Sequence, residues 1–244
     1  MTEPVARRFS GKRLFLYEEE NLVFGYTTID FSSAALKALF PGQPLLFLRQ
    51  VHGERILGEG EWRPAGEADG LLVERGGGVA VIQTADCLPL FFFDDGRRRG
   101  GVLHVGWRGL RHGIEERLAA RLGSALSSYS FFLGPGIERD CYEVGEELRQ
   151  QFSEKAYAKE IFATVRPGKL RLDLKAGLKS SLRALGVPRE RIGDCGLCTS
   201  CSRLFPSYRR DGASGRRIFN FLALGPRRLA VAAAGSETSS RPLP

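Results

Sequence analysis

The sequence predicts an α+β fold in which mixed or antiparallel β-sheets are flanked by helices. Short apolar runs bounded by glycine outnumber the segments with helical spacing, and several runs follow one another with no helix between them. That order argues against a regular alternation of strands and helices. With 244 residues of ordinary globular composition, the chain can form one large domain without a disulfide or structural metal.

The apolar runs and the helical stripes give the expected elements in order. Strands are expected at residues 22–27, 45–51, 70–74, 79–83, 88–93, 101–105, 131–133 and 227–233. Three apolar stripes predict helices: Leu110, Ile114, Leu118 and Leu122; Val144, Leu148 and Phe152; and Leu174, Leu178, Leu182 and Leu185. Gly123 is a suitable end for the first helix, and Asp173 is a suitable N-cap for the third, which should stop at residues 186–188.

Residues 1–234 are expected to form a single domain, followed by a polar tail at 235–244. The net charge of +8 comes mostly from arginines that are scattered along the chain. An anionic small-molecule substrate explains this charge as well as nucleic acid does, and the scatter disfavours a nucleic-acid surface. Since no apolar run suits a signal peptide or a membrane span, we expect a cytoplasmic protein with reduced cysteines, either a monomer or a homodimer.

Two of the three histidines, and one cysteine, fall at the ends of predicted strands. His52 follows the run 45–51, His104 lies near the end of the run 101–105, and Cys87 lies between two runs. Two imidazoles and a thiolate suit zinc, and three protein ligands leave a fourth position for water or substrate. The alternative is that they are hydrogen-bonded histidines and a small core cysteine. Spacing alone favours that alternative, because the three residues form no local signature; His112 is expected on a helix surface.

Several short strings occur in the same order as in a known family. They are QVHG at 50–53, ADG at 68–70, TADCLP at 84–89, HVGWRG at 104–109, GPGI at 134–137, CYEV at 141–144, CT at 198–199, and SYRRDG at 207–212 leading to GR at 215–216. Together they span nearly the whole chain, and the sequence resembles the YfiH-like family, whose members are described both as polyphenol oxidases and as purine nucleoside phosphorylases.

The resemblance implies a fold, a metal site and an activity. The fold would be an αββα sandwich shared with a toxin deamidase domain, with His52, Cys87 and His104 as zinc ligands. The activity would be phosphorolysis of adenosine, inosine and methylthioadenosine, or deamination of adenosine. Each reaction needs a proton donor, for which Asp86 is the first candidate and Glu143 the second.

Three other functions stay open. A metal-independent cysteine hydrolase could use Cys87 as nucleophile and His104 as its base. A copper ion in the zinc site could give polyphenol oxidase activity. A true multicopper oxidase, however, needs about ten histidine ligands, and this chain has three histidines. A non-enzymatic protein that binds metal or nucleic acid is the third alternative.

The sequence departs from the family where a substrate anion would bind. An Asn-Arg pair expected upstream of the QVHG string is absent, since residues 30–34 read DFSSA. The anion contact is therefore expected from Arg108, Arg210 or Arg216, in or near glycine-containing turns, whereas strand alternation turns Arg49 away. A second metal site at Cys195, Cys198 and Cys201 is less favoured than inert thiols, because such sites normally need four ligands.

Overall fold

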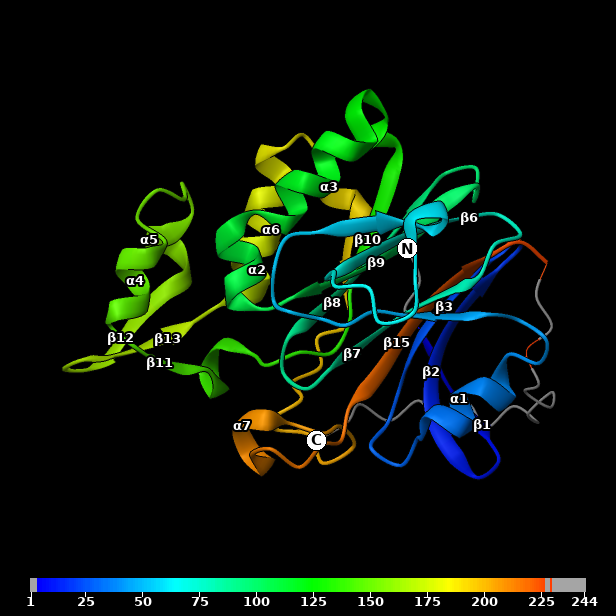
Figure 1. Ribbon diagram of the computed structural model, residues 1–244. Coiled ribbons are helices and arrows are strands. Elements are labelled where there is room, and N and C mark those ends of the chain that lie inside the picture. Colours follow the sequence, from blue (N-terminus) through cyan, green and yellow to red (C-terminus); the bar gives the residue numbers. More distant parts are fainter. Residues whose placement is uncertain (1–3, 227–228, 230–244) are drawn as a thin grey trace.

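The protein is a sandwich of two six-stranded β-sheets between outer layers of helices, seen in a computed structural model that describes residues 4–226 and Leu229 (Figure 1). The predicted α+β class is confirmed. The first sheet runs β1 (Val5–Phe9), β2 (Lys12–Glu19), β3 (Leu22–Thr27), β15 (Ile218–Leu224), β7 (Val79–Thr84), β4 (Leu45–Phe47). The second runs β14 (Ile192–Asp194), β10 (Tyr129–Leu133), β8 (Leu88–Asp94), β9 (Arg99–Val105), β6 (Gly70–Glu74), β5 (Ile56–Gly58).

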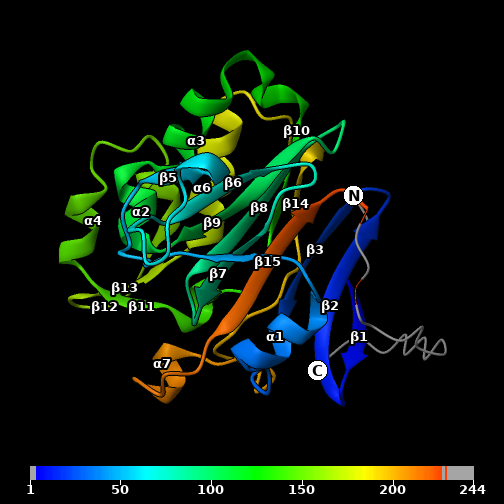
Figure 2. The same ribbon diagram turned by 45° about the vertical axis from the view of Figure 1, so that its right-hand side comes forward.

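Helices cover the two outer faces, and a small third sheet with two short helices beside it extends from one side (Figures 1 and 2). That sheet contains β11 (Glu143–Gly145), β13 (Lys169–Leu172) and β12 (Phe162–Arg166). The helices are α1 (Ser33–Leu39), α2 (Trp107–His112), α3 (Ile114–Leu122), α4 (Glu147–Gln151), α5 (Ala158–Ile161), α6 (Leu174–Ala184) and α7 (Tyr208–Asp211). Helices α2, α3 and α6 pack against the second sheet, and α1 covers the first. Within the described residues, 4–226 and Leu229, no helix is long and apolar enough to cross a membrane.

The core has three apolar layers, because side chains alternate between the two faces of each strand. In β8, Leu90 and Phe92 pack toward the helices, whereas Phe91 and Phe93 pack between the two sheets. This arrangement buries both faces of each central strand. It explains why the sequences of these strands are continuous apolar runs. From such a run one cannot tell which side chains face the helices and which face the other sheet.

Three predicted elements differ from the structure. The first helix is divided into α2 and α3 at Gly113, whose left-handed conformation ends the earlier helix. Val144 belongs to β11, so α4 begins only at Glu147. The predicted strand 45–51 ends at Phe47, because beyond it the side chain of Gln50, rather than the backbone, exchanges two hydrogen bonds with the backbone of Gln83.

The structure has a last strand that was not predicted from the sequence. The structure has β15 at Ile218–Leu224 in the middle of the first sheet, paired with β3 and β7. The predicted strand 227–233 falls outside the described residues except for Leu229, and the predicted tail lies outside them altogether. The third helix is confirmed, since Asp173 caps α6 by accepting a hydrogen bond from the backbone N–H of Ala176.

Candidate metal and active site

The order of strands in the second sheet brings residues that are distant in sequence to the same end of the sheet. Strand β9 lies antiparallel between β8 and β6, so the end of β9 meets the beginning of both neighbours. His104 near the end of β9 therefore lies beside Cys87, which precedes β8, and beside Asp69, which precedes β6. His52 comes from the loop between β4 and β5.

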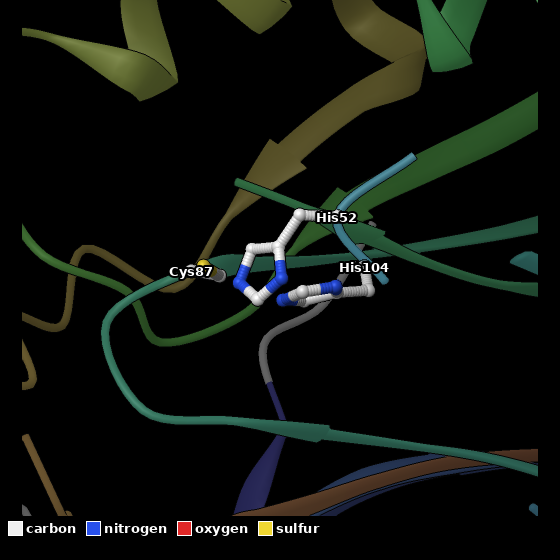
Figure 3. Close-up of side chains that lie close together, drawn as sticks. All are labelled: His52, Cys87 and His104. Carbon is white, nitrogen blue, oxygen red and sulfur yellow. The ribbon is translucent and has the colours of Figure 1, made fainter. Parts of the chain in front are cut away.

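The predicted set of His52, Cys87 and His104 is brought together (Figure 3). Ring nitrogens and the thiol sulfur all lie within 4.8 Å of one another. The two imidazole rings have centroids 4.7 Å apart and are inclined at 73°. His104 is buried, Cys87 is partly exposed and His52 is exposed. The group therefore lies at one end of the sandwich and is open to solvent on the side of His52.

Asp69 organises this group from beneath. Its buried carboxylate accepts hydrogen bonds from the backbone N–H groups of Val51 (3.2 Å), His52 (2.9 Å) and Gly53 (2.7 Å). Oδ1 also lies 2.7 Å from Nδ1 of His104. His104 therefore carries a proton on Nδ1, which leaves Nε2 as the nitrogen that can ligate a metal. Enclosure by Asp69 also holds His52 in the left-handed conformation, at φ 60°.

Cys87 and His104 shift each other's ionisation. Burial would raise the pKa of the Cys87 thiol, but the two imidazoles lower it to about 6. Burial would lower the pKa of His104, but the Cys87 thiolate and the Asp69 carboxylate raise it to about 9. Around neutral pH the cysteine is thus a thiolate, the form that binds metals and acts as a nucleophile.

Gly106 allows the close approach of the cysteine and His52. A Cβ at this position would lie 3.0 Å from Sγ of Cys87 and 3.2 Å from Cδ2 of His52, closer than side chains normally pack. Its backbone is extended, so the need for glycine here comes from space alone. The string HVGWRG therefore contains His104 and the glycine that makes room for Cys87 and His52.

The carboxylate of Asp86 is used to hold neighbouring segments. Oδ1 accepts a hydrogen bond from Oγ1 of Thr199 (2.6 Å), and Oδ2 accepts one from the backbone N–H of Arg209 (2.6 Å). Asp86 is buried and has a positive φ of 87°. These bonds fix the loop of Thr199 and the start of α7 beside Cys87.

Tyr142 and the arginines form the surroundings of the group. Burial and the charge of Cys87 raise the pKa of Tyr142. The Arg209 guanidinium lies 5.3 Å over the Tyr142 ring and donates to the backbone carbonyl of Glu143 (2.7 Å). The Glu143 carboxylate pairs with Arg166 at 2.9 Å, and Arg108 is exposed over the ring of its neighbour Trp107.

Arg210 and Arg216, the two arginines expected to bind an anion, have different surroundings. The guanidinium of Arg210 donates to Asp211 and to a ring of backbone carbonyls, those of Thr199, Ser200, Ser202 and Phe205. Because every N–H direction of its fork is used, Arg210 anchors this loop. Arg210 and Arg216 both line an open hollow of about 490 Å³, together with Ile29, Arg203, Asp211 and Ser214. Arg49 pairs with Glu67 at the surface, as expected from its turned-away position.

Sequence reasoning did not single out Asp69 and Arg209 for roles in the site. A signal for Asp69 was present, since an aspartate directly before a fully apolar strand is a poor core residue unless donors surround it. Arg209 gave no comparable signal. Its neighbours in SYRRDG are also cationic, and only the tertiary structure selects the one that faces Tyr142.

Comparisons with known proteins agree with the fold and the motifs. The family model described as multi-copper polyphenol oxidoreductase laccase matches residues 31–223. A purine nucleoside phosphorylase of Xylella fastidiosa strain Temecula1 is 36% identical over 70% of this chain and 68% of its own. An adenosine deaminase from an unknown prokaryotic organism is 31% identical over 72% of this chain and 73% of its own length. The crystal structure of the Bacillus licheniformis hypothetical protein YfiH superposes with a TM-score of 0.78 at 27% identity. The match covers 89% of this chain and 98% of that one. The resemblance inferred from the motifs is confirmed.

Proposed function

The chain belongs to the family described as multi-copper polyphenol oxidoreductase laccase, and we propose that it is a zinc-dependent enzyme acting on purine nucleosides. The substrates are adenosine, inosine and methylthioadenosine, with phosphate or water as the acceptor. Relatives named purine nucleoside phosphorylase and adenosine deaminase support the substrate class. The observation that carries the proposal is the convergence of two imidazoles and one thiolate at the open end of the sandwich.

The donor set fits zinc. His104 offers Nε2 because Asp69 fixes the proton on Nδ1, and Cys87 is a thiolate near neutral pH. Three ligands with one open side are the pattern of catalytic zinc sites. When bound, the ion would act as a Lewis acid and lower the pKa of a coordinated water to about 7. Copper can occupy a site with the same ligands.

The residues around the group have separate tasks. In phosphorolysis a phosphate oxygen bonds to the ribose C1′ while the bond from C1′ to the base breaks, and the base takes up a proton. In deamination the oxygen of water bonds to the ring carbon and ammonia leaves. Both need a proton donor, and the candidates are Asp86 and Glu143. Glu143 is the more available proton donor, because its carboxylate forms an ion pair with Arg166 at the surface. Both oxygens of Asp86, in contrast, accept hydrogen bonds within the protein.

The proton donor can be identified from the pH dependence of kcat. If Glu143 donates the proton, Glu143→Gln removes one limb of the pH profile and leaves the KM for the nucleoside close to that of the wild type. If Asp86→Asn alone removes that limb, the assignment to Glu143 is wrong. Zinc content measured on both variants shows whether the metal site is intact.

We assign the phosphate contact to Arg216, assisted by Arg108. Both arginines line the open hollow, but the guanidinium N–H groups of Arg210 already donate within the protein, which favours Arg216 as the anion contact. We expect Arg216→Gln to raise the KM for phosphate several-fold at unchanged zinc content, because one charge-assisted contact is lost. The neighbouring Arg217→Gln, which does not line the hollow, is the control. Equal phosphate KM values in the two variants would place the pocket elsewhere.

A metal-independent cysteine hydrolase is the second candidate, favoured by the lowered pKa of Cys87 beside His104. In that function the thiolate would attack a carbonyl carbon and His104 would protonate the leaving group. Removal of metal by a chelator separates the candidates, because the hydrolase would stay active and the nucleoside enzyme would not.

Product analysis by mass spectrometry tests the proposed reaction. Protein incubated with adenosine and phosphate should yield adenine and ribose 1-phosphate, and without phosphate any product should be inosine. His52→Ala, prepared in parallel, should yield neither. Unchanged adenosine in both conditions with zinc-loaded wild-type protein would contradict the proposal.

A further inference from the structure

Three of the remaining four cysteines converge at a second place in the fold. The sulfur atoms of Cys141, Cys198 and Cys201 all lie within 4.8 Å of one another, and those of Cys141 and Cys201 are 3.0 Å apart. The sequence suggested Cys195 as the partner of Cys198 and Cys201. The structure instead packs Cys195 against the core between the sheets and supplies Cys141 from another segment.

The backbone prepares Cys198 to carry negative charge. Its sulfur accepts hydrogen bonds from the backbone N–H groups of Glu138 and Cys201, each at 3.5 Å. The second of these closes a turn over Cys198-Thr199-Ser200-Cys201, so the two thiols of the C-x-x-C step face the same side. A bridge between Gly136 and Cys198 holds this turn against the segment that leads to Cys141.

Thiols that lie this close together oppose one another's ionisation. The hydrogen bond with Cys141 and the proximity of Cys198 raise the pKa of Cys201 to about 12. Burial opposes ionisation of Cys198, yet the backbone N–H groups lower its pKa overall. A divalent cation bound to the three sulfurs would supply positive charge that favours their thiolate forms.

We propose that Cys141, Cys198 and Cys201 bind a second zinc ion as thiolates, with water at the fourth position. Zinc–sulfur bonds of about 2.3 Å in a tetrahedral arrangement place sulfurs about 3.8 Å apart. All three sulfurs lie within 4.8 Å of one another, and the pair at 3.0 Å would separate by about 0.8 Å through side-chain rotation. Cys201 is exposed, so the ion can enter from solvent.

The second ion would stabilise a loop that borders the candidate active site. Thr199 lies inside the C-x-x-C turn and donates to Asp86, the residue before Cys87. Arg210 holds the same turn through the carbonyls of Thr199 and Ser200. This zinc would therefore hold the turn of residues 198–201 in place beside Asp86 and Cys87.

Zinc stoichiometry tests the proposal, with Cys195 as a matched control in the same segment. Wild type, Cys201→Ser, Cys141→Ser and Cys195→Ser are each equilibrated with zinc under a reductant that does not bind metal, desalted and measured by elemental mass spectrometry. We expect Cys201→Ser and Cys141→Ser to hold one zinc fewer per chain than Cys195→Ser. This difference does not depend on whether the His52 group binds zinc. Equal zinc content in the three variants would overturn the proposal.

Alkylation of the wild-type protein covers the case in which a variant fails to fold. Added zinc should protect Cys141, Cys198 and Cys201 from alkylation, as read by peptide mass mapping, and a chelator should remove the protection. Alkylation of all three at the same rate with and without zinc would contradict the proposal. So would a Cys141–Cys201 disulfide in protein kept under reductant, because that bond would remove two of the three ligands.

Discussion

Asp69→Asn is the substitution for which the structure gives the clearest expectation. The carboxylate has two oxygens, and each accepts two hydrogen bonds. One oxygen serves the backbone N–H groups of Val51 and Gly53, and the other serves the N–H of His52 and Nδ1 of His104. An asparagine presents one oxygen and one NH₂ group. In either orientation of the amide, two buried donors therefore face another donor.

The magnitude follows from those two unpaired donors. Each buried donor without an acceptor costs about 1–3 kcal/mol, so the free energy of unfolding should fall by roughly 2–6 kcal/mol. The affinity for zinc should fall by about 10–100-fold, because Asp69 orients His104 and fixes its tautomer. Both effects should appear together, since one carboxylate supports the His52 loop and His104.

Two assays on metal-stripped protein separate the effects. Urea unfolding measures stability, and competition with a fluorescent zinc chelator measures affinity. Asp173→Asn is the control, because asparagine caps a helix as well as aspartate does at the N-terminus of α6. If Asp69→Asn matches this control in both assays, Asp69 does not organise the group and the reasoning is refuted.

Three further predictions follow from single features of the structure. Burial raises the pKa of Glu115 to about 7. The stability of the wild type should therefore fall as the pH rises from about 4.5 to 7, because in this range the unfolded chain releases the proton and the folded chain keeps it. Glu115→Gln, which can keep the hydrogen bond from Ser181, should be more stable at pH 8 by up to about 3 kcal/mol and near wild type at pH 4.5; pH-independent urea midpoints would contradict this. Gly106→Ala should weaken zinc binding by about tenfold or more, whereas Gly60→Ala, with open space around it, should not; equal chelator competition curves would argue against the packing reason. Phenol oxidation should be slow and require added copper, and fast turnover by copper-free, zinc-loaded protein would show that the explanation by metal exchange is wrong.

Local sequence patterns predicted elements that depend on local interactions. Strands β3 and β6 match the expected ranges, and Asp173 caps α6 as its position before the Leu174 stripe indicated. The division between α2 and α3 was missed because Leu110 and Ile114 keep the same helical spacing on both sides of Gly113. Periodicity does not reveal a left-handed glycine that changes the helix direction without breaking the stripe.

The candidate site was predicted only in part, because its geometry depends on strand order. Strand-end positions and the family motifs together selected His52, Cys87 and His104, but the placement of β9 between β8 and β6 brings Asp69 beneath them. The same limit applies to Cys141, which is far in sequence from Cys198 and meets it through the bridge at Gly136. Arg210 and Arg216 are equivalent in sequence, and only tertiary hydrogen bonds distinguish an anchor from a solvent-facing cation.

Adenosine consumption by metal-stripped protein during zinc titration tests the central claim most directly. The account predicts that stripped wild-type protein leaves adenosine unchanged and that turnover returns as zinc is added. His52→Ala protein, treated in the same way, should not recover. If stripped wild-type protein consumes adenosine at its original rate, the group at His52, Cys87 and His104 does not act through a metal, and the proposed function is wrong.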